Sequence, residues 1–427
     1  MKSISFVINC SKNTLEYLKL LVQSLKVNLY SKDHQILIFI DSDNEGILEY
    51  LLSEKNNFND FTIINNTLKP CVGYSRNNNL LVDYAKHDIV SYLQSDMVIS
   101  PNYDLDILSQ LQENTILSST RVEPPLHGIS DKTITKNFGL IPKDFSLDTW
   151  NRESILLKKS KTASYFFAPI TFYKDVWLSL GGYDTVFRRS REDSDLVQRA
   201  LHSGISLVQT YQAIVYHFSC VSSRGVDWFN KSNSQAASRV DLQNKADYIE
   251  LRRFLRKWGD FNHGENKLYK LDIDLELENL QEADLNLIYN IEPFFSRVWI
   301  PSESIKLELS KLYNKEHLPA NILLEFTEDM WNSNKRYYNL ESIEDKVKVG
   351  KCNSYNIKFT MDFRKLKELP DSFKINCTKL YDILINLEKG KYDFDGILVD
   401  INSKNIINPS LKIENPPFDT EHLQIFY

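Results

Sequence analysis

Through the first hundred residues, short β-rich runs alternate with segments of helical periodicity, and this alternation constrains the fold more than any other feature. In chain order the expected strands are 4–9, 35–41, 61–65 and 88–94, and the expected helices between them are 14–27, 46–52 and 75–86. Strands that alternate with helices indicate βαβ units and a mostly parallel sheet. The sequence therefore predicts an α/β fold, in which ligands bind at the carboxyl ends of the strands.

Three of the expected strands end at polar side chains. Asn9 closes the first strand, Asp41 closes the second, and Asp96 follows the fourth. Because these ends meet at one edge of a parallel sheet, we expect the three side chains to lie close together. An unpaired buried carboxylate is costly, so Asp96 is expected either to be exposed or to lie beside a positive charge. Asp41 could instead start a turn, and Asp43 competes with it for any binding role.

A second group of motifs follows later in the chain. An apolar run leads into a helix start and a Gly-Gly turn at 181–182, and a further helix is predicted over 190–204. Strand signals over 205–219 then end at His217. Between 119 and 165 the periodicity fades, and we expect loops with short pieces of structure there.

The sequence changes character after residue 220. Residues 271–279 and 357–363 alternate strictly between apolar and polar side chains, which is typical of half-buried strands in an antiparallel sheet. We therefore expect two domains: an α/β domain at 1–260 and a smaller, β-rich domain of unknown role at 261–427.

The composition of the chain limits which binding partners and which cellular compartment we expect. The formal net charge of -6 argues against non-specific nucleic-acid binding, which requires a basic face. Five scattered cysteines without a Cys-x-x-Cys pair suit a reducing compartment and offer no zinc site. No apolar run approaches the ~18 residues of a membrane-spanning helix, and the N-terminal run is too short for a signal peptide. We expect a cytoplasmic protein without a transmembrane segment. The basic stretch 252–257 either packs against the first domain, which we favour, or touches a membrane surface.

The order of these motifs resembles that of the family 2 glycosyltransferases, which have the GT-A fold. The resemblance covers roughly residues 3–230, and its specific part is GGYD at 181–184 followed by EDSDLVQRALHSG at 192–204. In that family a carboxylate after the second strand holds the nucleobase, and an Asp-x-Asp-like motif after the fourth strand holds a divalent metal and the diphosphate. A later Gly-Gly-x-Asp…Glu-Asp segment carries the catalytic base, and a distal His can complete the metal shell.

This resemblance, together with the strand ends, gives each residue an expected role. The residues expected to bind the nucleotide-sugar are Asn9, Asp41, Arg76, Gln94, Ser95 and Asp96. Asp96 and His217 are the expected ligands of a divalent metal, Mn²⁺ or Mg²⁺. Asp193 is the expected catalytic base, with Glu192 as the second choice. Gln94 departs from the family, which has Asp at the first position of this motif, so the site has one carboxylate fewer.

Sugar transfer requires these residue types. A hard divalent ion held by oxygen ligands stabilises charge on the departing diphosphate, and a His ligand favours Mn²⁺. The acceptor hydroxyl needs a base within hydrogen-bond reach of its proton. We therefore expect an inverting, metal-dependent hexosyltransferase that moves a sugar from a UDP-sugar to a hydroxyl of a glycan or glycosylated acceptor. The second domain could bind the acceptor, a partner chain or a second copy of itself in a homo-oligomer.

Two other classes of protein remain open. A sugar-phosphate nucleotidyltransferase would carry a Gly-rich basic loop after the first strand, whereas residues 9–14 read NCSKNT and contain no glycine. The second class is a catalytically inactive, glycosyltransferase-like protein that binds glycans or acts as a scaffold. The neutral Gln94 is the feature that favours it.

Individual residues also have structural interpretations. Asp193 completes an S-x-x-[DE] capping pattern with Ser190, and His217 alone would be an ordinary strand-end histidine. Arg76 could be a surface residue, and Asp184 could cap the Gly-Gly turn. Tryptophans are mostly core residues and arginine clusters mostly solvated surfaces, so the acceptor site stays unassigned. The aromatic and basic residues that could contact an acceptor are Trp150, Tyr165, Trp177, Arg188, Arg189 and Arg191.

Overall fold

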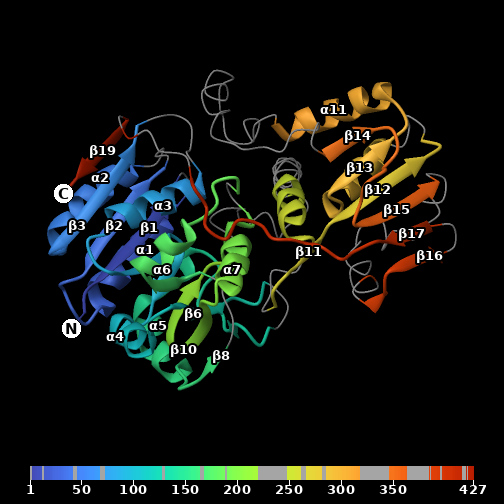
Figure 1. Ribbon diagram of the computed structural model, residues 1–427. Coiled ribbons are helices and arrows are strands. Elements are labelled where there is room, and N and C mark those ends of the chain that lie inside the picture. The colour runs from blue at the N-terminus through green and yellow to red at the C-terminus, as the bar shows by residue number, and fades with distance from the viewer. Residues whose placement is uncertain are drawn as a thin grey trace.

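Two β-sheets organise the chain, and they lie side by side in Figure 1. The computed structural model describes residues 2–11, 14–41, 46–67, 73–126, 130–163, 168–187, 190–219, 248–260, 266–280, 285–317, 346–362, 384, 386–394, 397–415, 420 and 422–427. Within these residues, eleven strands form the larger sheet and six form the smaller one. The α/β class with a largely parallel central sheet and a separate β-rich C-terminal region is therefore confirmed.

The first half of the larger sheet is parallel, as the strand–helix alternation predicts. Its elements are β1 (Ile4–Cys10), α1 (Leu15–Asn28), β2 (Gln35–Ile40), α2 (Ile47–Glu54), η1 (Lys55–Asn57), β3 (Asp60–Asn66), α3 (Tyr74–Tyr84) and β4 (Ile89–Gln94). The strands lie in the order β3-β2-β1-β4, and each neighbouring pair is parallel. The chain adds β2 and β3 on one side of β1 and then returns to add β4 on the other side. In doubly wound sheets, ligands bind at the point between the two strands where this change occurs, here β1 and β4.

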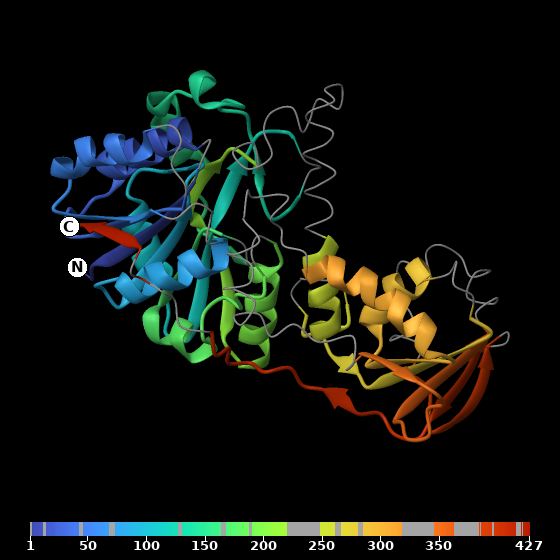
Figure 2. The ribbon, with the colours of Figure 1, turned by 90° about the horizontal axis from the view of Figure 1, so that it is seen from above.

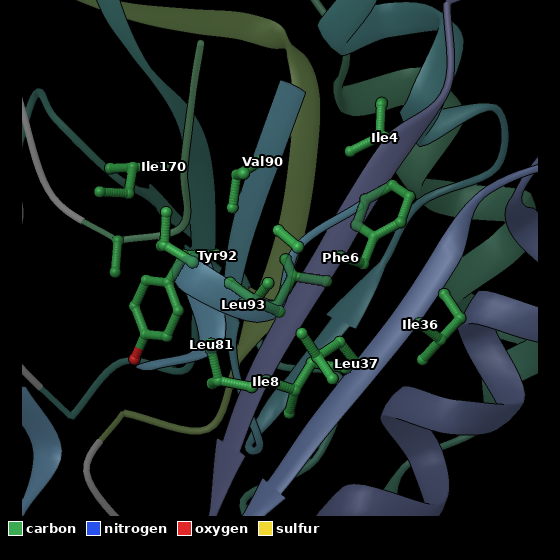
Figure 3. Close-up of a cluster of buried hydrophobic side chains, with 14 of the residues drawn as sticks. Ile4, Phe6, Ile8, Ile36, Leu37, Leu81, Val90, Tyr92, Leu93 and Ile170 are labelled. Carbon is green, nitrogen blue, oxygen red and sulfur yellow. The ribbon is translucent and has the colours of Figure 1, made fainter. Parts of the chain in front are cut away.

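Apolar side chains from β1, β2 and β4 pack together in the core of this sheet (Figure 3). Ile4, Phe6 and Ile8 of β1 belong to the same buried cluster as Leu37 of β2 and Leu93 of β4. Parallel strands covered on both faces require nearly continuous apolar runs, and the sequences ISFVIN and QILIFI provide them. Each fully buried side chain of this kind contributes about 1.5–3 kcal/mol to the hydrophobic stabilisation of the fold.

The second half of the larger sheet mixes strand directions. Its elements are β5 (Met97–Ile99), α4 (Tyr103–Gln110), β6 (Thr115–Glu123), β7 (Ile134–Thr135), η2 (Pro142–Asp144), α5 (Leu147–Leu157), β8 (Thr162–Ala163), β9 (Ile170–Tyr173), α6 (Lys174–Leu180), α7 (Glu192–His202) and β10 (Ser206–His217). β9 is antiparallel to β4 and β6, whereas β6 and β10 are parallel. The helix and the strand predicted over 190–219 are confirmed as α7 and β10.

The prediction of loops between 119 and 165 is wrong where β6 and α5 lie. β6 lacks a clear hydrophobic pattern because several of its buried residues are polar. The hydroxyls of Ser119 and Tyr103 are 2.8 Å apart, and Thr120 Oγ1 donates to the carbonyl of Thr210 at 2.8 Å. Hydrogen bonds to distant residues make these positions compatible with burial, and such partners are not visible in a local pattern.

The smaller sheet is mostly parallel, which corrects the antiparallel prediction. Its elements are β12 (Ile273–Glu278), α10 (Leu285–Ile291), η5 (Glu292–Phe294), β13 (Arg297–Ile300), α11 (Glu303–His317), β14 (Val347–Val349), β15 (Ile357–Asp362), β16 (Gly390–Phe394) and β17 (Ile397–Ile401). The strands β14-β13-β12-β15 are parallel, and β17 is antiparallel to both of its neighbours, β15 and β16. The order β14-β13-β12-β15 repeats the order β3-β2-β1-β4 of the larger sheet.

The alternation in β12 arises from buried ion pairs. Asp274 is fully buried, and Arg297 donates to its two carboxylate oxygens at 2.6 and 2.7 Å. The ammonium of Lys358 lies 3.3 Å from Glu276. Paired acids inside a protein produce the same alternation as acids that face solvent. The pattern therefore identifies a strand but does not distinguish a parallel from an antiparallel sheet.

A basic helix over residues 248–258 packs against both parts of the chain. Arg252 and Arg256 lie 3.0 and 2.7 Å from the carboxylate of Glu292, beside the smaller sheet. Lys257 lies 2.8 Å from Asp184, which follows the Gly-Gly turn of the first part. The basic stretch therefore packs against the first part of the chain, as favoured from the sequence, and also against the second part, which was not expected.

The C-terminal end of the chain returns from the smaller sheet to the larger one (Figure 2). After β18 (Ile406–Ile407), which pairs with β11 (Lys270–Leu271), the described residues 408–415, 420 and 422–427 form what we call the C-terminal tail. Its strand β19 (Leu423–Phe426) pairs antiparallel with β3 at the edge of the larger sheet. The expected division at residue 260 places this strand in the second domain, although it completes the first sheet.

Buried tyrosines should make the fold sensitive to alkaline pH. Burial raises the pKa of Tyr17 and the pKa of Tyr216 from 10.0 to about 12. Because the folded pKa lies above the unfolded one, this stabilisation is complete below about pH 10 and is lost as the pH rises towards about 12. We expect the free energy of unfolding, measured in urea, to fall across that interval. A constant free energy of unfolding there would contradict the prediction.

Candidate functional site

The carboxyl ends of β1, β2 and β4 bring the expected polar residues to one edge of the sheet. Asn9 lies opposite Gln94 in the β1–β4 ladder. Asp41 follows β2 directly, and Ser95 and Asp96 form the turn after β4. The structure therefore brings together the strand-end residues that the sequence predicts to be neighbours.

Asp41 connects this edge to the start of α3. Its Oδ2 accepts a hydrogen bond from the backbone N–H of Gly73 at 3.3 Å. Asn77, in the first turn of α3, donates from Nδ2 to Asn9 Oδ1 at 3.5 Å. Arg76 lies in the same turn and is partly buried. Asp41, Asn9 and Arg76 therefore belong to segments that contact one another directly.

Gln94 takes part in a hydrogen bond that the sequence did not suggest. Its Nε2 donates to the phenol oxygen of Tyr74 at 3.2 Å. Its Oε1 is buried and has no hydrogen-bond partner within the described part of the chain. Tyr74 begins α3 and packs edge-on against Tyr92, with ring centroids 5.8 Å apart. Sequence reasoning missed Tyr74, although it stands two positions before Arg76 in the same polar helix start.

The phenol of Tyr74 is where acids from distant parts of the chain converge. Its pKa is raised well above the usual value, first by burial and then by the negative charges of Glu192, Asp193 and Asp96. Charges shift a pKa in this way only from nearby positions. The first turn of α7 and the turn after β4 therefore both lie near this phenol.

His217, at the end of β10, lies between two carboxylates. Its Nε2 is 3.7 Å from Oδ1 of Asp96, and its Nδ1 is 2.7 Å from Oε1 of Glu123. A carboxylate that holds one ring nitrogen orients the other nitrogen towards its own partner. Asp96 is thus buried rather than exposed, and it lies beside the imidazole of His217. Glu123, at the end of β6, was missed because it lies in the region where periodicity fades.

The acids at the start of α7 occupy different environments. Asp193 is partly exposed, and its Oδ1 accepts a hydrogen bond from the backbone N–H of Ser194 at 2.6 Å. Glu192 is buried. The alternative capping role does not fit Ser190, because its hydroxyl lies 2.9 Å from Glu250 and the helix begins after Arg191 without a side-chain cap. Asp193 is therefore the acid of this pair with access to solvent.

Asp195, two residues after Asp193 in α7, stabilises the Gly-Gly turn that precedes this helix. Its buried carboxylate accepts hydrogen bonds from Arg199 Nε at 2.7 Å and from Trp258 Nε1 at 2.9 Å. The same guanidinium donates to the carbonyls of Leu180 and Gly182, both at 2.7 Å. Burial alone would raise the pKa of Asp195, but the charges of Lys257 and Arg199 outweigh it and lower that pKa. The D-x-x-x-R part of the motif thus holds the Gly-Gly turn.

The aromatic residues considered for an acceptor site belong to the core where they are described. Trp150 is 0% exposed and donates from Nε1 to the carbonyl of Ile99 at 2.9 Å. Trp177 is 4% exposed and stacks on Phe172, with ring centroids 4.8 Å apart. These two tryptophans are too buried to stack on a sugar. The candidates that lie outside the described residues are Asp43, Tyr165, Arg188 and Arg189.

Asp96 and His217 fit a divalent ion only as part of its shell. Among the described residues, no group of three or more His, Cys, Asp or Glu side chains could hold a metal by itself. Asp96 offers oxygen and His217 offers a nitrogen that Glu123 orients. An ion that takes its other ligands from a diphosphate and from water matches such a donor set.

Comparison with known proteins identifies the family of this part of the chain. Residues 6–165 match the model of the family described as "Glycosyl transferase family 2". This region is a family 2 glycosyltransferase domain. The matched residues include the strand edge from Asn9 to Asp96, whereas α7 and His217 lie beyond them. The family recognised from the sequence motifs is therefore confirmed.

No curated protein matches the chain, whereas several solved structures are similar to parts of it. A structure of GalNAc-T7 with UDP, GalNAc and Mn²⁺ is 14% identical with a TM-score of 0.40, covering 51% of this chain and 44% of that one. S. aureus TarS is 12% identical with a TM-score of 0.40, covering 79% and 55%. S. aureus TarS 1-349 in complex with UDP-GlcNAc is 12% identical with a TM-score of 0.37, covering 60% and 81%. The chain thus spans about half the length of the first two proteins.

The described helices show no membrane-spanning candidate. None of them is both long enough and apolar enough to cross a bilayer.

Proposed function

We propose that this family 2 domain makes the chain an inverting, metal-dependent hexosyltransferase. It would move a sugar from a UDP-sugar to a hydroxyl of a glycan or glycosylated acceptor. The observation that carries the proposal is that His217 lies 3.7 Å from Asp96 at the sheet edge, where Gln94 donates to Tyr74 and the acids Glu192 and Asp193 lie near that phenol. A cytoplasmic location, and an acceptor-binding, partner-binding or self-associating role for the second domain, belong to the same proposal.

The donor would lie along the strand edge. Asp41 and Arg76 flank the start of α3 and would hold the nucleoside, with Asn9 beside them. Gln94, Ser95 and Asp96 would face the diphosphate. Asp96 and His217 would hold the divalent ion, and Glu123 would keep the imidazole in place. When bound, such an ion supplies Lewis-acid stabilisation of charge on the departing diphosphate.

Asp193 would act as the general base. The acceptor oxygen forms a bond to the anomeric carbon of the sugar while the bond from that carbon to the diphosphate oxygen breaks. The diphosphate leaves with the electron pair, and Asp193 takes the proton of the acceptor hydroxyl. Attack from the face opposite the diphosphate inverts the anomeric carbon. Asp193 suits this role better than Glu192 because Asp193 is partly exposed, whereas Glu192 is buried.

Donor binding should depend on Asp96 and His217. We expect Mn²⁺ and a UDP-sugar together to raise the thermal midpoint of the wild-type protein in a concentration-dependent way, since a ligand of the native state stabilises it. At a donor concentration near 100 times Kd, the gain is about 2.7 kcal/mol. Asp96→Asn and His217→Ala should remove the part of this gain that requires Mn²⁺.

A matched control tests whether any acid on this strand has the same effect. Asp88 is exposed at the opposite end of β4, so Asp88→Asn should respond to donor and Mn²⁺ like the wild type. Equal responses of the wild type, Asp96→Asn and His217→Ala would remove the metal role from both residues.

The scaffold alternative is favoured by Gln94, whose amide donates to Tyr74 and supplies no charge to a metal. Slow hydrolysis of a UDP-sugar in the presence of Mn²⁺ separates the two functions, because a transferase commonly uses water when no acceptor is present. A scaffold should release no UDP under any tested condition.

A further inference from the structure

The turn from Leu180 to Tyr183, which leads towards α7, is held by hydrogen bonds at every backbone carbonyl. As described above, Arg199 donates to the first and third of these oxygens. Asn79 of α3 and a residue of the C-terminal tail both donate to the carbonyl of Tyr183. The tail also donates to the carbonyls of Leu180 and Gly181. No carbonyl of this turn therefore depends on solvent for its hydrogen bond, and three separate parts of the chain determine the position of the turn.

Asn415 is the residue of the tail that contributes most to this arrangement. Its Nδ2 donates to the carbonyl of Gly181 at 2.8 Å and to that of Tyr183 at 2.9 Å. Its Oδ1 accepts a hydrogen bond from the backbone N–H of Thr185 at 3.2 Å. The backbone N–H of Ile413 also donates to the carbonyl of Leu180 at 3.0 Å. One side chain thus bridges two positions of the turn and Thr185 just after it, from more than 200 residues away in the sequence.

The two glycines of the turn allow other segments to pack closely against it. Gly181 has φ of +72°, a conformation that strongly favours glycine, and a Cβ there would overlap the carbonyl of Ile413. Gly182 also has φ of +72°, and a Cβ there would overlap the carboxamide of Asn79 and the indole of Trp177. The first glycine of the motif is therefore the place where the tail packs, and the second is where α3 and α6 pack. Figure 2 shows the tail running from the smaller sheet to this side of the larger one.

We propose that the tail segment 413–415 is a clamp on the turn before α7, and that Asn415 is a positioning residue for Asp193. The inference rests on the proposed function, since it gives the tail a part in the transfer reaction. Asn415 acts through the turn, since its hydrogen bonds within the described part of the chain go to Gly181, Tyr183 and Thr185. Moving a base by about 1 Å can lower a rate about 100-fold, so a looser turn should affect catalysis before it affects donor binding.

Two pairs of variants test the clamp. Gly181→Ala adds a methyl group where Ile413 lies, whereas Gly204→Ala adds one at a similar φ of +75° with no atom within 4 Å. Asn415→Ala removes the bridging side chain. Gln424→Ala removes another side chain of the tail, which lies 3.4 Å from Asn65 on the exposed edge.

We expect Gly181→Ala and Asn415→Ala to lower kcat at least about tenfold, with donor Kd changed less than about twofold. Gly204→Ala and Gln424→Ala should keep the wild-type kcat. Hydrogen exchange at the amides of Ile413 and Ser194 should become faster in the first pair only. A purely structural role would instead lower the amount of folded protein and leave kcat per folded molecule unchanged.

Three results would overturn the clamp: equal loss of kcat in both glycine variants, unchanged kcat in Asn415→Ala, or unchanged exchange at Ser194 in both Asn415→Ala and Gly181→Ala. If the wild-type protein transfers no sugar from any donor, the proposed function fails but the exchange measurement still decides the clamp. Faster exchange at Ser194 in Asn415→Ala would then support the part of the inference in which the tail holds the turn, but not its effect on catalysis.

Discussion

Asp193→Asn is expected to lower the kcat of sugar transfer by about 100- to 10,000-fold, the usual contribution of a general base. The neutral amide keeps the shape of the side chain and its contact with the backbone of Ser194, but it cannot accept the acceptor proton. Donor affinity should stay unchanged, because the strand-edge residues Asp41 and Asp96 are intact. Steady-state kinetics together with donor titration by calorimetry would measure both quantities.

The control for this variant is Asp148→Asn, which removes an exposed acid from the first turn of another helix, α5. Its kcat should match the wild type. Glu192→Gln provides the internal comparison, because a larger loss there than in Asp193→Asn would transfer the base role to Glu192. Full activity of both α7 variants would end the case for a carboxylate base in this helix.

Asp195→Ala is expected to lower the free energy of unfolding by about 3–5 kcal/mol, the typical cost of removing one partner of a buried ion pair. Asp195 and Arg199 are both 0% exposed, and the carboxylate also accepts hydrogen bonds from Trp258 and contacts Lys257. The variant would leave the guanidinium buried without its counter-charge. Urea denaturation followed by circular dichroism would give the difference.

The pH dependence of the same pair provides an independent measurement. The folded pKa of Asp195 is lowered from 3.8, so its stabilisation is complete above about pH 4 and is lost as the pH falls through the folded pKa. The wild type should therefore lose more stability than Asp195→Ala on acidification below about pH 4. Glu16→Gln is the exposed control, since Glu16 is 65% exposed in its pair with Lys19 and should cost less than about 1 kcal/mol. A loss below that value for Asp195→Ala would contradict the structural role.

The first half of the larger sheet could be predicted because each element has a local cause. β1 and β2 are buried on both faces, so their sequences are mostly apolar, and α1 presents its buried leucines at helical spacing. Asn9, Asp41 and Asp96 interrupt this pattern where strands reach the edge. The direction of parallel strands then places them together without any knowledge of the final packing.

The rest of the site was harder to predict because its residues act through distant partners. Tyr74 and Glu123 have no motif of their own, and each matters only because Gln94 or His217 lies beside it. The smaller sheet was assigned the wrong strand direction for a similar reason. Asp274 in β12 is polar yet buried, and only its contact with Arg297 from the next strand explains this.

Short-range periodicity and motifs were enough to predict the family of the first part of the chain, the parallel half of the first sheet and the edge at which its polar residues gather. Three features could be recognised only in the folded chain: Asp195 and Arg199 hold the Gly-Gly turn, Asn415 bridges this turn from the tail, and β19 pairs with β3. Hydrogen bonds and ion pairs between distant segments depend on how the whole chain packs. No local run of residues specifies them, since the same Asn, Asp or Gly would be equally acceptable in an ordinary exposed turn.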